Sequence, residues 1–193
     1  MNLKFTWFVF IWAIVGGTCT TATSKSYLQD SSGFDTTFSS STKQFRSDKI
    51  PDSIFQMTHL RHLAISGMDC DYSPHPDCWG IAELPAEIKN LTELTSLSLT
   101  LSGISVIPDE LTGLKNLKLI DLSDGSLSNA NLDNLTRIKS LEYLYLYGCG
   151  LTKLPTTIGN LVNLKELGLS GNSFDKAEQA RIKKELPKCI IKF

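Results

Sequence analysis

The sequence has almost no net charge, few histidines and few cysteines. Its 193 residues contain 19 Lys and Arg against 20 Asp and Glu, which gives a formal net charge of −1, and no long basic run occurs. Charge therefore gives no support for binding to nucleic acid or acidic lipid. The spacing of the three histidines, His59, His62 and His75, suggests no catalytic triad. No glycine-rich phosphate loop occurs either, so we expect no enzymatic activity and no cofactor.

Only one long hydrophobic run is present, at the N-terminus. It covers Phe5–Val15, follows the basic Lys4 and precedes a run of small residues. This order is typical of a secretory signal peptide, and eleven residues are too few for a membrane span, which takes about 20 as a helix. We expect removal of residues 1–22 and a secreted or extracytoplasmic product, in the periplasm or at the cell surface. Lipoprotein anchoring through Cys19 is an alternative.

Residues 23–47 are rich in serine and threonine. Such a composition buries little apolar surface and is typical of mobile segments, so we predict a linker here. Phe34 and Phe38 offer an alternative, in which this segment docks on the N-terminal end of the domain that follows.

One pattern, L-x-x-L-x-L, recurs along the rest of the chain. The leading leucines are Leu60, Leu94, Leu117, Leu141 and Leu164, at spacings of 34, 23, 24 and 23 residues. The first spacing is one period plus 11 inserted residues. Ten residues before the leading position stands an aliphatic residue followed by proline, in four copies: Ile50-Pro51, Leu84-Pro85, Ile107-Pro108 and Leu154-Pro155.

Five copies in phase, over roughly residues 48–193, resemble the leucine-rich repeat family. The form of Leu151–Pro155 resembles the typical bacterial and Ras-associated type of repeat. The resemblance implies an α/β solenoid with a curved parallel sheet on the concave side and 3-10 helices, loops or short helices on the convex side. Leucines of one repeat become buried only against the next repeat, and the prolines, which cannot donate a backbone hydrogen bond, belong outside the sheet.

The family's asparagine, eight residues after the leading leucine, is present only as Asn172. Its equivalents are Met68, Ser102, Gly125 and Cys149. We therefore expect a weaker ladder of buried amides in the middle of the solenoid.

An insertion at 68–79 contains Cys70 and Cys78. In an exported chain, two cysteines in a proline-containing loop favour a disulfide. A metal site with His75 is the alternative, but the spacing matches no standard zinc pattern, and we expect no metal.

The C-terminal residues 175–193 are predicted to form a cap. Asp175 and Glu178 have the spacing of a capping box, followed by a helix over Lys176–Glu185 and a sixth repeat at Leu186. Cys149 and Cys189 would lie two strands apart, about 9–10 Å, beyond the ~7 Å limit of a disulfide between α-carbons. We predict two buried free thiols.

Positions two, four and six after each leading leucine point away from the core. In the fourth repeat all three are tyrosines: Tyr143, Tyr145 and Tyr147. Tyrosine offers a large contact area and a hydroxyl, which binding surfaces favour, although it also has a general preference for strands. We predict that these tyrosines form the centre of a partner-binding patch, flanked by small side chains that leave the rings accessible. Its flanking residues are Leu119, Asp121 and Glu166.

These observations predict an exported, non-catalytic, monomeric interaction protein. It would bind a protein or peptide through the concave sheet face and the loop of Cys70 and Cys78. A structural or adhesive envelope protein, an inhibitor of a secreted enzyme, and a hydrolase using His62 or His75 are the alternatives. Asn90 and Asn134 begin Asn-Leu-Thr glycosylation sequons, which the repeat itself also produces.

Overall fold

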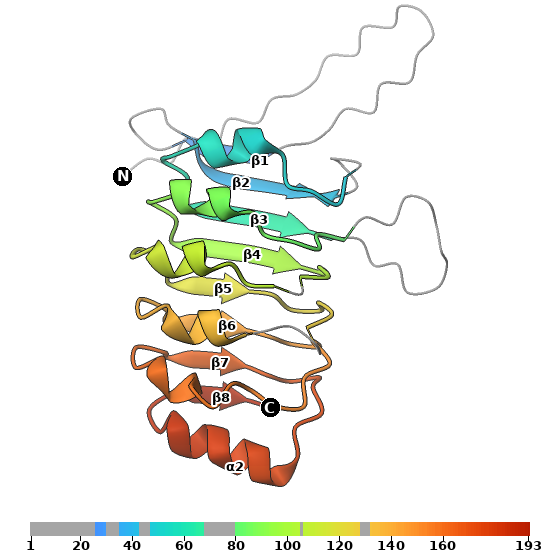
Figure 1. The fold of residues 1–193 in the computed structure, drawn as a ribbon, viewed down its shortest axis with the longest axis vertical. Helices are drawn as coiled ribbons and strands as arrows, with labels where there is room; N and C mark the ends of the chain where they lie inside the picture. The colour runs from blue at the N-terminus through green and yellow to red at the C-terminus, as the bar shows by residue number, and fades with distance from the viewer. Residues whose placement is uncertain (1–25, 30–34, 43–46, 68–79, 105, 128–131) are drawn as a thin grey trace, which may run out of the picture.

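The computed structural model describes residues 26–29, 35–42, 47–67, 80–104, 106–127 and 132–193. One eight-stranded sheet runs the length of the molecule in chain order, and β2 to β8 are parallel (Figure 1). The strands are β1 (Ser26–Gln29), β2 (Asp35–Ser41), β3 (His62–Ser66), β4 (Ser96–Thr100), β5 (Leu119–Asp121), β6 (Tyr143–Tyr145), β7 (Glu166–Gly168) and β8 (Ile190–Lys192). The predicted α/β repeat solenoid is confirmed, as an open sheet.

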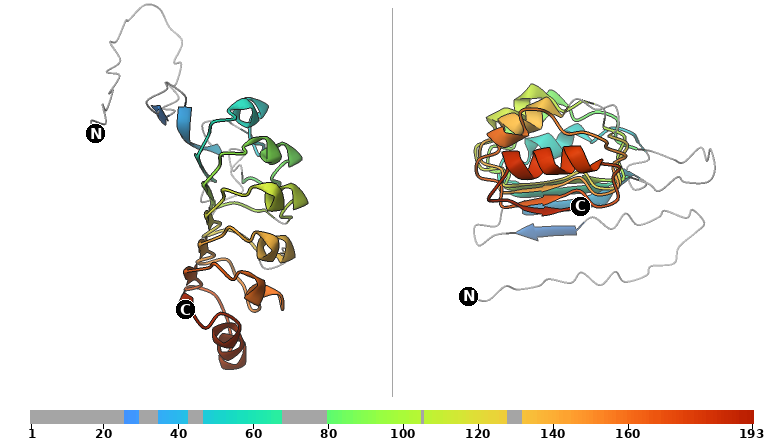
Figure 2. Two further views of the ribbon diagram at one scale, coloured as in Figure 1. Left: turned by 90° about the vertical axis from the view of Figure 1, so that its left-hand side faces the viewer. Right: turned by 90° about the horizontal axis from the view of Figure 1, so that it is seen from below.

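Short 3-10 helices form a second column on one side of the sheet (Figure 2). They are η1 (Asp52–Gln56), η2 (Ala86–Asn90), η3 (Asp109–Gly113), η4 (Asp133–Arg137) and η5 (Ile158–Asn160). Pro51, Pro85 and Pro108 precede the first three, where their carbonyls accept the first helical hydrogen bonds. The prolines therefore lie outside the sheet, as predicted, because a strand position would have required a backbone donor.

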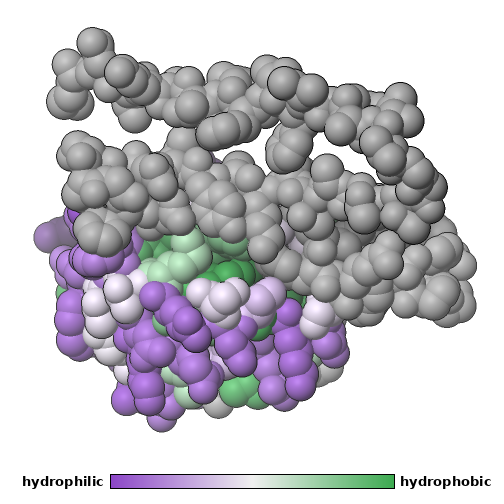
Figure 3. Space-filling view, turned by 90° about the horizontal axis from the view of Figure 1, so that it is seen from above, coloured by the Kyte–Doolittle hydropathy of each residue, from purple (hydrophilic) through white to green (hydrophobic). Residues whose placement is uncertain are grey.

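The repeating leucines are buried between the sheet and the 3-10 helices. Leu60, Leu94, Leu117 and Leu141 are all 0% exposed. In the view from the N-terminal end, hydrophobic side chains lie in the middle and hydrophilic ones toward the outside (Figure 3). Since each repeat depends on its neighbours for this burial, the core runs continuously along the stack.

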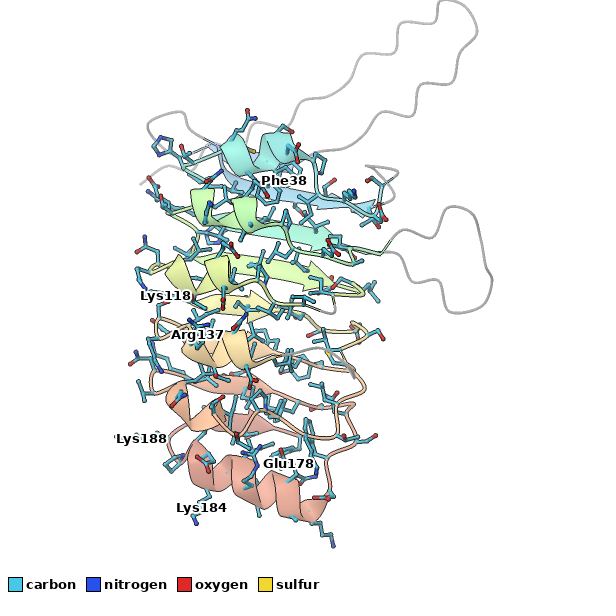
Figure 4. All side chains as sticks on the ribbon, viewed as in Figure 1. Phe38, Lys118, Arg137, Glu178, Lys184 and Lys188 are labelled. Atoms are coloured by element: carbon cyan, nitrogen blue, oxygen red, sulfur yellow. The ribbon has the colours of Figure 1, made fainter. Side chains whose placement is uncertain are left out.

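The structure differs from the linker predicted for residues 23–47. Its described parts form β1 and β2, and β2 pairs in parallel with β3 so that Phe38 stands beside Leu63. Phe38 is 1% exposed and occupies the inward position of a strand at the N-terminal end of the stack (Figure 4). The docking alternative is therefore correct for Phe38, whereas Phe34 lies outside the described residues.

The chain turns sharply at the seventh position after the leading leucine. Backbone φ there is positive in four successive repeats: Leu101 (52°), Asp124 (57°), Gly148 (58°) and Gly171 (80°). Glycine adopts this left-handed conformation freely and aspartate tolerates it, but leucine does so only at a steric cost. In the middle of the solenoid, Leu101 and Asp124 thus adopt the left-handed conformation although they are not glycines, and the next residue in each case is not the family's asparagine.

The asparagine position shows three different solutions. The Asn172 side chain makes four hydrogen bonds, to the backbone of the fourth and fifth repeats. In the fourth repeat the thiol of Cys149 donates to Leu122 O at 3.2 Å, and in the second the hydroxyl of Ser102 donates to Leu99 O at 2.8 Å. A thiol or a hydroxyl donates fewer bonds than an amide, so the predicted weakening of the ladder has a structural basis.

Helix α2 (Lys176–Glu185) covers the end of the core, and β8 adds the predicted sixth repeat. Asp175 caps α2, since its carboxylate accepts from Glu178 N at 2.7 Å. The side chain of Glu178 does not complete a capping box but is buried, accepting from Leu154 N at 2.9 Å and from Arg181 at 2.6 Å (Figure 4). It ties the cap to the preceding repeat.

Glu178→Gln is expected to lower the free energy of unfolding at pH 7 by about 1–2 kcal/mol. The hydrogen bond from Arg181, more than that from Leu154, lowers the pKa of Glu178. A lowered pKa stabilises the fold fully above the ordinary Glu pKa of about 4.3, and that stabilisation is lost as the pH falls through the lowered value. Urea unfolding at pH 7 and pH 3 measures this: the difference from wild type should shrink at pH 3. Glu87→Gln, at an exposed position of η2, is the control. A loss of unfolding free energy from Glu178→Gln that is the same at both pH values would refute the account.

Several predicted features lie outside the described residues. These are the signal peptide at 1–22, the loop at 68–79 and, with it, the proposed Cys70–Cys78 disulfide. Cys149 and Cys189 are free thiols, as predicted, but Cys189 is half-buried and not fully enclosed. Among the described residues, no helix has the length and apolar character that a membrane span requires.

Candidate partner-binding face

The 3-10 helices lie on one side of the sheet (Figure 2), and the outward side chains of the strands form the opposite face. Strand register aligns them in rows that cross the strands. One row contains His62, Ser96, Leu119, Tyr143, Glu166 and Ile190, and the next contains Ala64, Ser98, Asp121, Tyr145, Gly168 and Lys192. Small side chains dominate β3 and β4, whereas large and charged side chains gather on β5 to β8. The large and charged side chains of this face are therefore concentrated in the C-terminal half of the sheet.

The three predicted tyrosines all lie half-buried on this face. Tyr145 and Tyr147 stack with ring centroids 5.6 Å apart and an interplanar angle of 20°. The ring of Tyr147 also covers Gly168, where an added Cβ would lie 2.2 Å from its Cζ. Gly168 therefore does not leave the ring open, as the sequence suggested, but serves as the surface on which the ring packs. These contacts hold the rings in place before any partner arrives.

Glu166 links the tyrosines to the last strand. Its carboxylate lies 2.6 Å from the ammonium of Lys192 on β8. Burial, followed by the charge of Glu166 and a hydrogen bond with it, raises the pKa of the Tyr145 phenol. Tyr145 is accordingly a neutral hydroxyl at physiological pH, and Glu166 is in place to orient it. Glu166 therefore lies at the border of the tyrosines, beside Tyr143 in the register and paired with Lys192.

A row of charges at the entrance to the strands was not predicted. Glu142 pairs with Lys118 at 3.1 Å and with Lys165 at 2.5 Å, on neighbouring repeats. Hydrogen bonds from Lys165 and then Lys118 lower the pKa of Glu142. Lys165 also lies over the ring of Tyr143, 6.0 Å from its centroid. The signal was present in the sequence as lysine, glutamate and lysine at the first position after three successive leading leucines, which places opposite charges side by side.

Leu119 and Asp121, the other flanking residues, stand beside the tyrosines as predicted. Register places Leu119 next to Tyr143 and Asp121 next to Tyr145. The carboxylate of Asp121 accepts from Ser123 N at 3.0 Å and from Ser123 Oγ at 2.6 Å, and Ser123 itself is buried. Asp121 therefore already has two donors within its own repeat, and Leu119 is the aliphatic side chain that extends the aromatic surface.

Groups capable of catalysis are not brought together in the described part of the chain. His59 pairs with Glu93 at 2.9 Å at an exposed position, His62 is exposed, and His75 lies outside the description. Burial raises the pKa of the Cys149 and Cys189 thiols to about 11, so neither is a thiolate nucleophile at neutral pH. The described residues also include no cluster of three or more potential metal ligands.

The periodic pattern matches a known family in sequence and in structure. The Leucine Rich Repeat family model matches residues 140–161. A solved leucine-rich repeat protein of Leptospira interrogans superposes with a TM-score of 0.63 at 32% identity, covering 75% of this chain and 34% of that one. The chain is a leucine-rich repeat protein. Leucine-rich repeat proteins are generally interaction modules and typically non-catalytic.

Other leucine-rich repeat proteins are similar over part of their length. The TMV resistance protein N of Nicotiana glutinosa is 31% identical over 156 residues, which are 66% of this chain and 13% of that protein. The ectodomain of the Arabidopsis thaliana receptor kinase GASSHO1/SCHENGEN3, solved in complex with Casparian strip integrity factor 2, shares the fold with a TM-score of 0.56 at 21% identity. That match covers 86% of this chain and 19% of the ectodomain. This leucine-rich repeat chain thus spans only a small part of its larger relatives.

Proposed function

We propose that this protein is an exported, non-catalytic interaction module that binds a protein or peptide. The binding site is the part of the sheet face centred on Tyr143, Tyr145 and Tyr147, with Leu119, Asp121 and Glu166 at its border. The loop at 68–79, stapled by Cys70 and Cys78, is a second contact. Export follows from the N-terminal hydrophobic run and is consistent with extracellular relatives of this fold.

The arrangement of the three tyrosines is the observation that carries this proposal. Tyrosine and tryptophan dominate binding energies because they bury much area while losing little side-chain freedom. Here the stacked pair and the packing of Tyr147 on Gly168 restrict the rings further. A preorganised surface loses less entropy when a partner binds, so more of the contact energy appears as affinity. Solved proteins of this fold that hold a protein ligand add support.

A triple variant tests the proposal: Tyr143→Ser, Tyr145→Ser and Tyr147→Ser in the same chain. The mature wild-type chain, used as bait with extracellular material from its source, should capture a specific protein or peptide, and the variant should lose it. A triple Tyr→Phe variant is the matched control, because it keeps the rings, and it should retain most of the capture. Circular dichroism confirms that each bait is folded. Equal capture by the serine variant and wild type would refute the proposal.

Gly168→Ala provides a finer test of the same site. The added methyl would collide with the ring of Tyr147 and displace it, without removing any tyrosine. Loss of one well-placed ring costs about 1 kcal/mol, so binding of the captured partner should weaken about fivefold. Gly113→Ala is the control, since an added Cβ there meets nothing within 4 Å. Titration calorimetry with the captured partner should separate the two variants; equal affinities would exclude Tyr147 from the contact.

A further inference from the structure

The charged groups around the tyrosines differ in how far they project. In the ion pairs, the side chains of Lys118, Lys165 and Lys192 are 59%, 62% and 52% exposed. Their partners Glu142 and Glu166 are only 19% and 20% exposed. An approaching molecule therefore meets ammonium groups first, while the carboxylates lie recessed behind them.

The exposed ammonium groups also keep hydrogen-bond donors that are not used within the site. The carboxylates have donors within the protein: Glu142 pairs with two lysines, Glu166 pairs with Lys192, and Asp121 accepts from the amide and hydroxyl of Ser123. An ammonium group has three N–H donors, and each of the three lysines has one carboxylate partner. The site thus retains N–H donors for an incoming acceptor, and the phenol hydroxyls add to them.

The net charge of the site indicates which kind of anionic partner it can bind. Three lysines oppose the three carboxylates of Asp121, Glu142 and Glu166, so the site is neutral at long range. Nucleic acids and other polyanions rely on many uncompensated cations and on counterion release, which this site does not provide. A peptide fits better if it has single carboxylates that contact the lysine ammonium groups and apolar side chains that pack on the tyrosine rings. Such a peptide matches both the exposed ammonium groups and the neutral total charge of the site.

From these contacts we infer that the partner segment is an acidic peptide or protein surface. Aspartate or glutamate side chains contact Lys118, Lys165 and Lys192, and apolar side chains interleaved with them pack on the tyrosine rings and on Leu119. This inference rests on the proposed function, because it assigns a chemistry to the same face. It adds three lysines that act in specificity, beside tyrosines that supply contact area.

A random-peptide display library, with the mature chain as bait, is the probe. Peptides selected by wild type and lost with the triple Tyr→Ser variant should be enriched in Asp and Glu over the input library. Against such a peptide, each of the variants Lys118→Gln, Lys165→Gln and Lys192→Gln should weaken binding about two- to fivefold, with the loss reduced at high salt. Lys115→Gln, Lys139→Gln and Lys188→Gln, exposed lysines elsewhere, are the charge-matched controls and should leave the affinity unchanged.

The outcomes separate this inference from the proposed function. If no selected peptide depends on the tyrosines, the proposed function itself fails. If tyrosine-dependent peptides are neutral or basic, or if the three lysine variants bind acidic peptides as well as wild type, only the acidic partner is overturned. Heparin is the polyanion comparison: competition by heparin at concentrations below those of the selected peptide would indicate a polyanion site and would also overturn the inference.

Discussion

Replacing Leu144 with alanine is expected to lower the free energy of unfolding by about 2–5 kcal/mol. Leu144 is 1% exposed at the middle of β6, with Ile120 and Leu167 beside it on the neighbouring strands. Removing three carbons there leaves a cavity that rigid coils on both sides cannot close. Because each repeat is stabilised by its neighbours, the loss should lower the stability of the whole stack rather than of one strand. Urea unfolding followed by circular dichroism measures it.

Leu119→Ala is the matched control for this result. The substitution is the same, but Leu119 lies half-buried on the open face, one strand away. We expect it to cost about 1 kcal/mol or less. Similar losses from the two variants would show that the face we describe as open is covered, or that Leu144 is not in the core.

Asn172→Ala is expected to cost about 2–5 kcal/mol, although Asn172 lies outside the hydrophobic core. Its side-chain oxygen accepts from Cys149 N at 3.0 Å and from Leu151 N at 2.9 Å. Its amide nitrogen donates to Leu146 O at 2.7 Å and to Leu169 O at 2.8 Å. Alanine leaves these four backbone groups without that partner at the turn between repeats, and each lost bond contributes about 0.5–1.5 kcal/mol.

Asn163→Ala separates this effect from the general loss of an asparagine. The exposed Asn163 side chain donates one hydrogen bond, to Lys139 O at 2.7 Å. Its replacement should cost less than about 1 kcal/mol in the same urea titration. Equal costs at the two positions would mean that the amide of Asn172 does not hold the fourth and fifth repeats together.

Periodicity predicted most of the fold because it is a property of the backbone path. Leucines at the inward strand positions and prolines ahead of the 3-10 helices recur at fixed spacing, so strand order, register and the placement of prolines followed from counting. Strand β2, at the N-terminal end of the stack, was not predicted from this periodicity. In β2 the register places Phe38 and Ser40 inward, beside Leu63 and Ile65, so only one large apolar side chain marks the repeat. Because Ser40 stands at an inward position where the other repeats have a leucine or isoleucine, the L-x-L pattern is absent from β2 although the strand forms.

The positions of the three tyrosines on the sheet face were predicted, but their contacts were not. Alternation along a strand places Tyr143, Tyr145 and Tyr147 on one face, and the structure has them there. Alternation does not determine how each ring is oriented. In the structure, the ring of Tyr147 lies across Gly168 of the next strand. Lys118 and Lys165 were overlooked because they precede the strands, where side-chain alternation is no guide. Lys192 lies on β8, in the C-terminal cap, beyond the five repeats whose outward residues were compared. The contact of Lys165 with the Tyr143 ring and the pairing of Lys192 with Glu166 connect them to the tyrosines, and Glu142 joins Lys165 to Lys118.

Hydroxyl-radical footprinting with the captured partner tests most directly whether this face is the binding surface. Oxidation of Tyr143, Tyr145 and Tyr147 should slow markedly when the partner is bound. Val162, 76% exposed and two residues after the end of the last 3-10 helix, should react at the same rate with and without the partner. Protection of Val162 while the three tyrosines react unchanged would place the partner at the turns between the 3-10 helices and the strands, away from the sheet face, and would contradict the account.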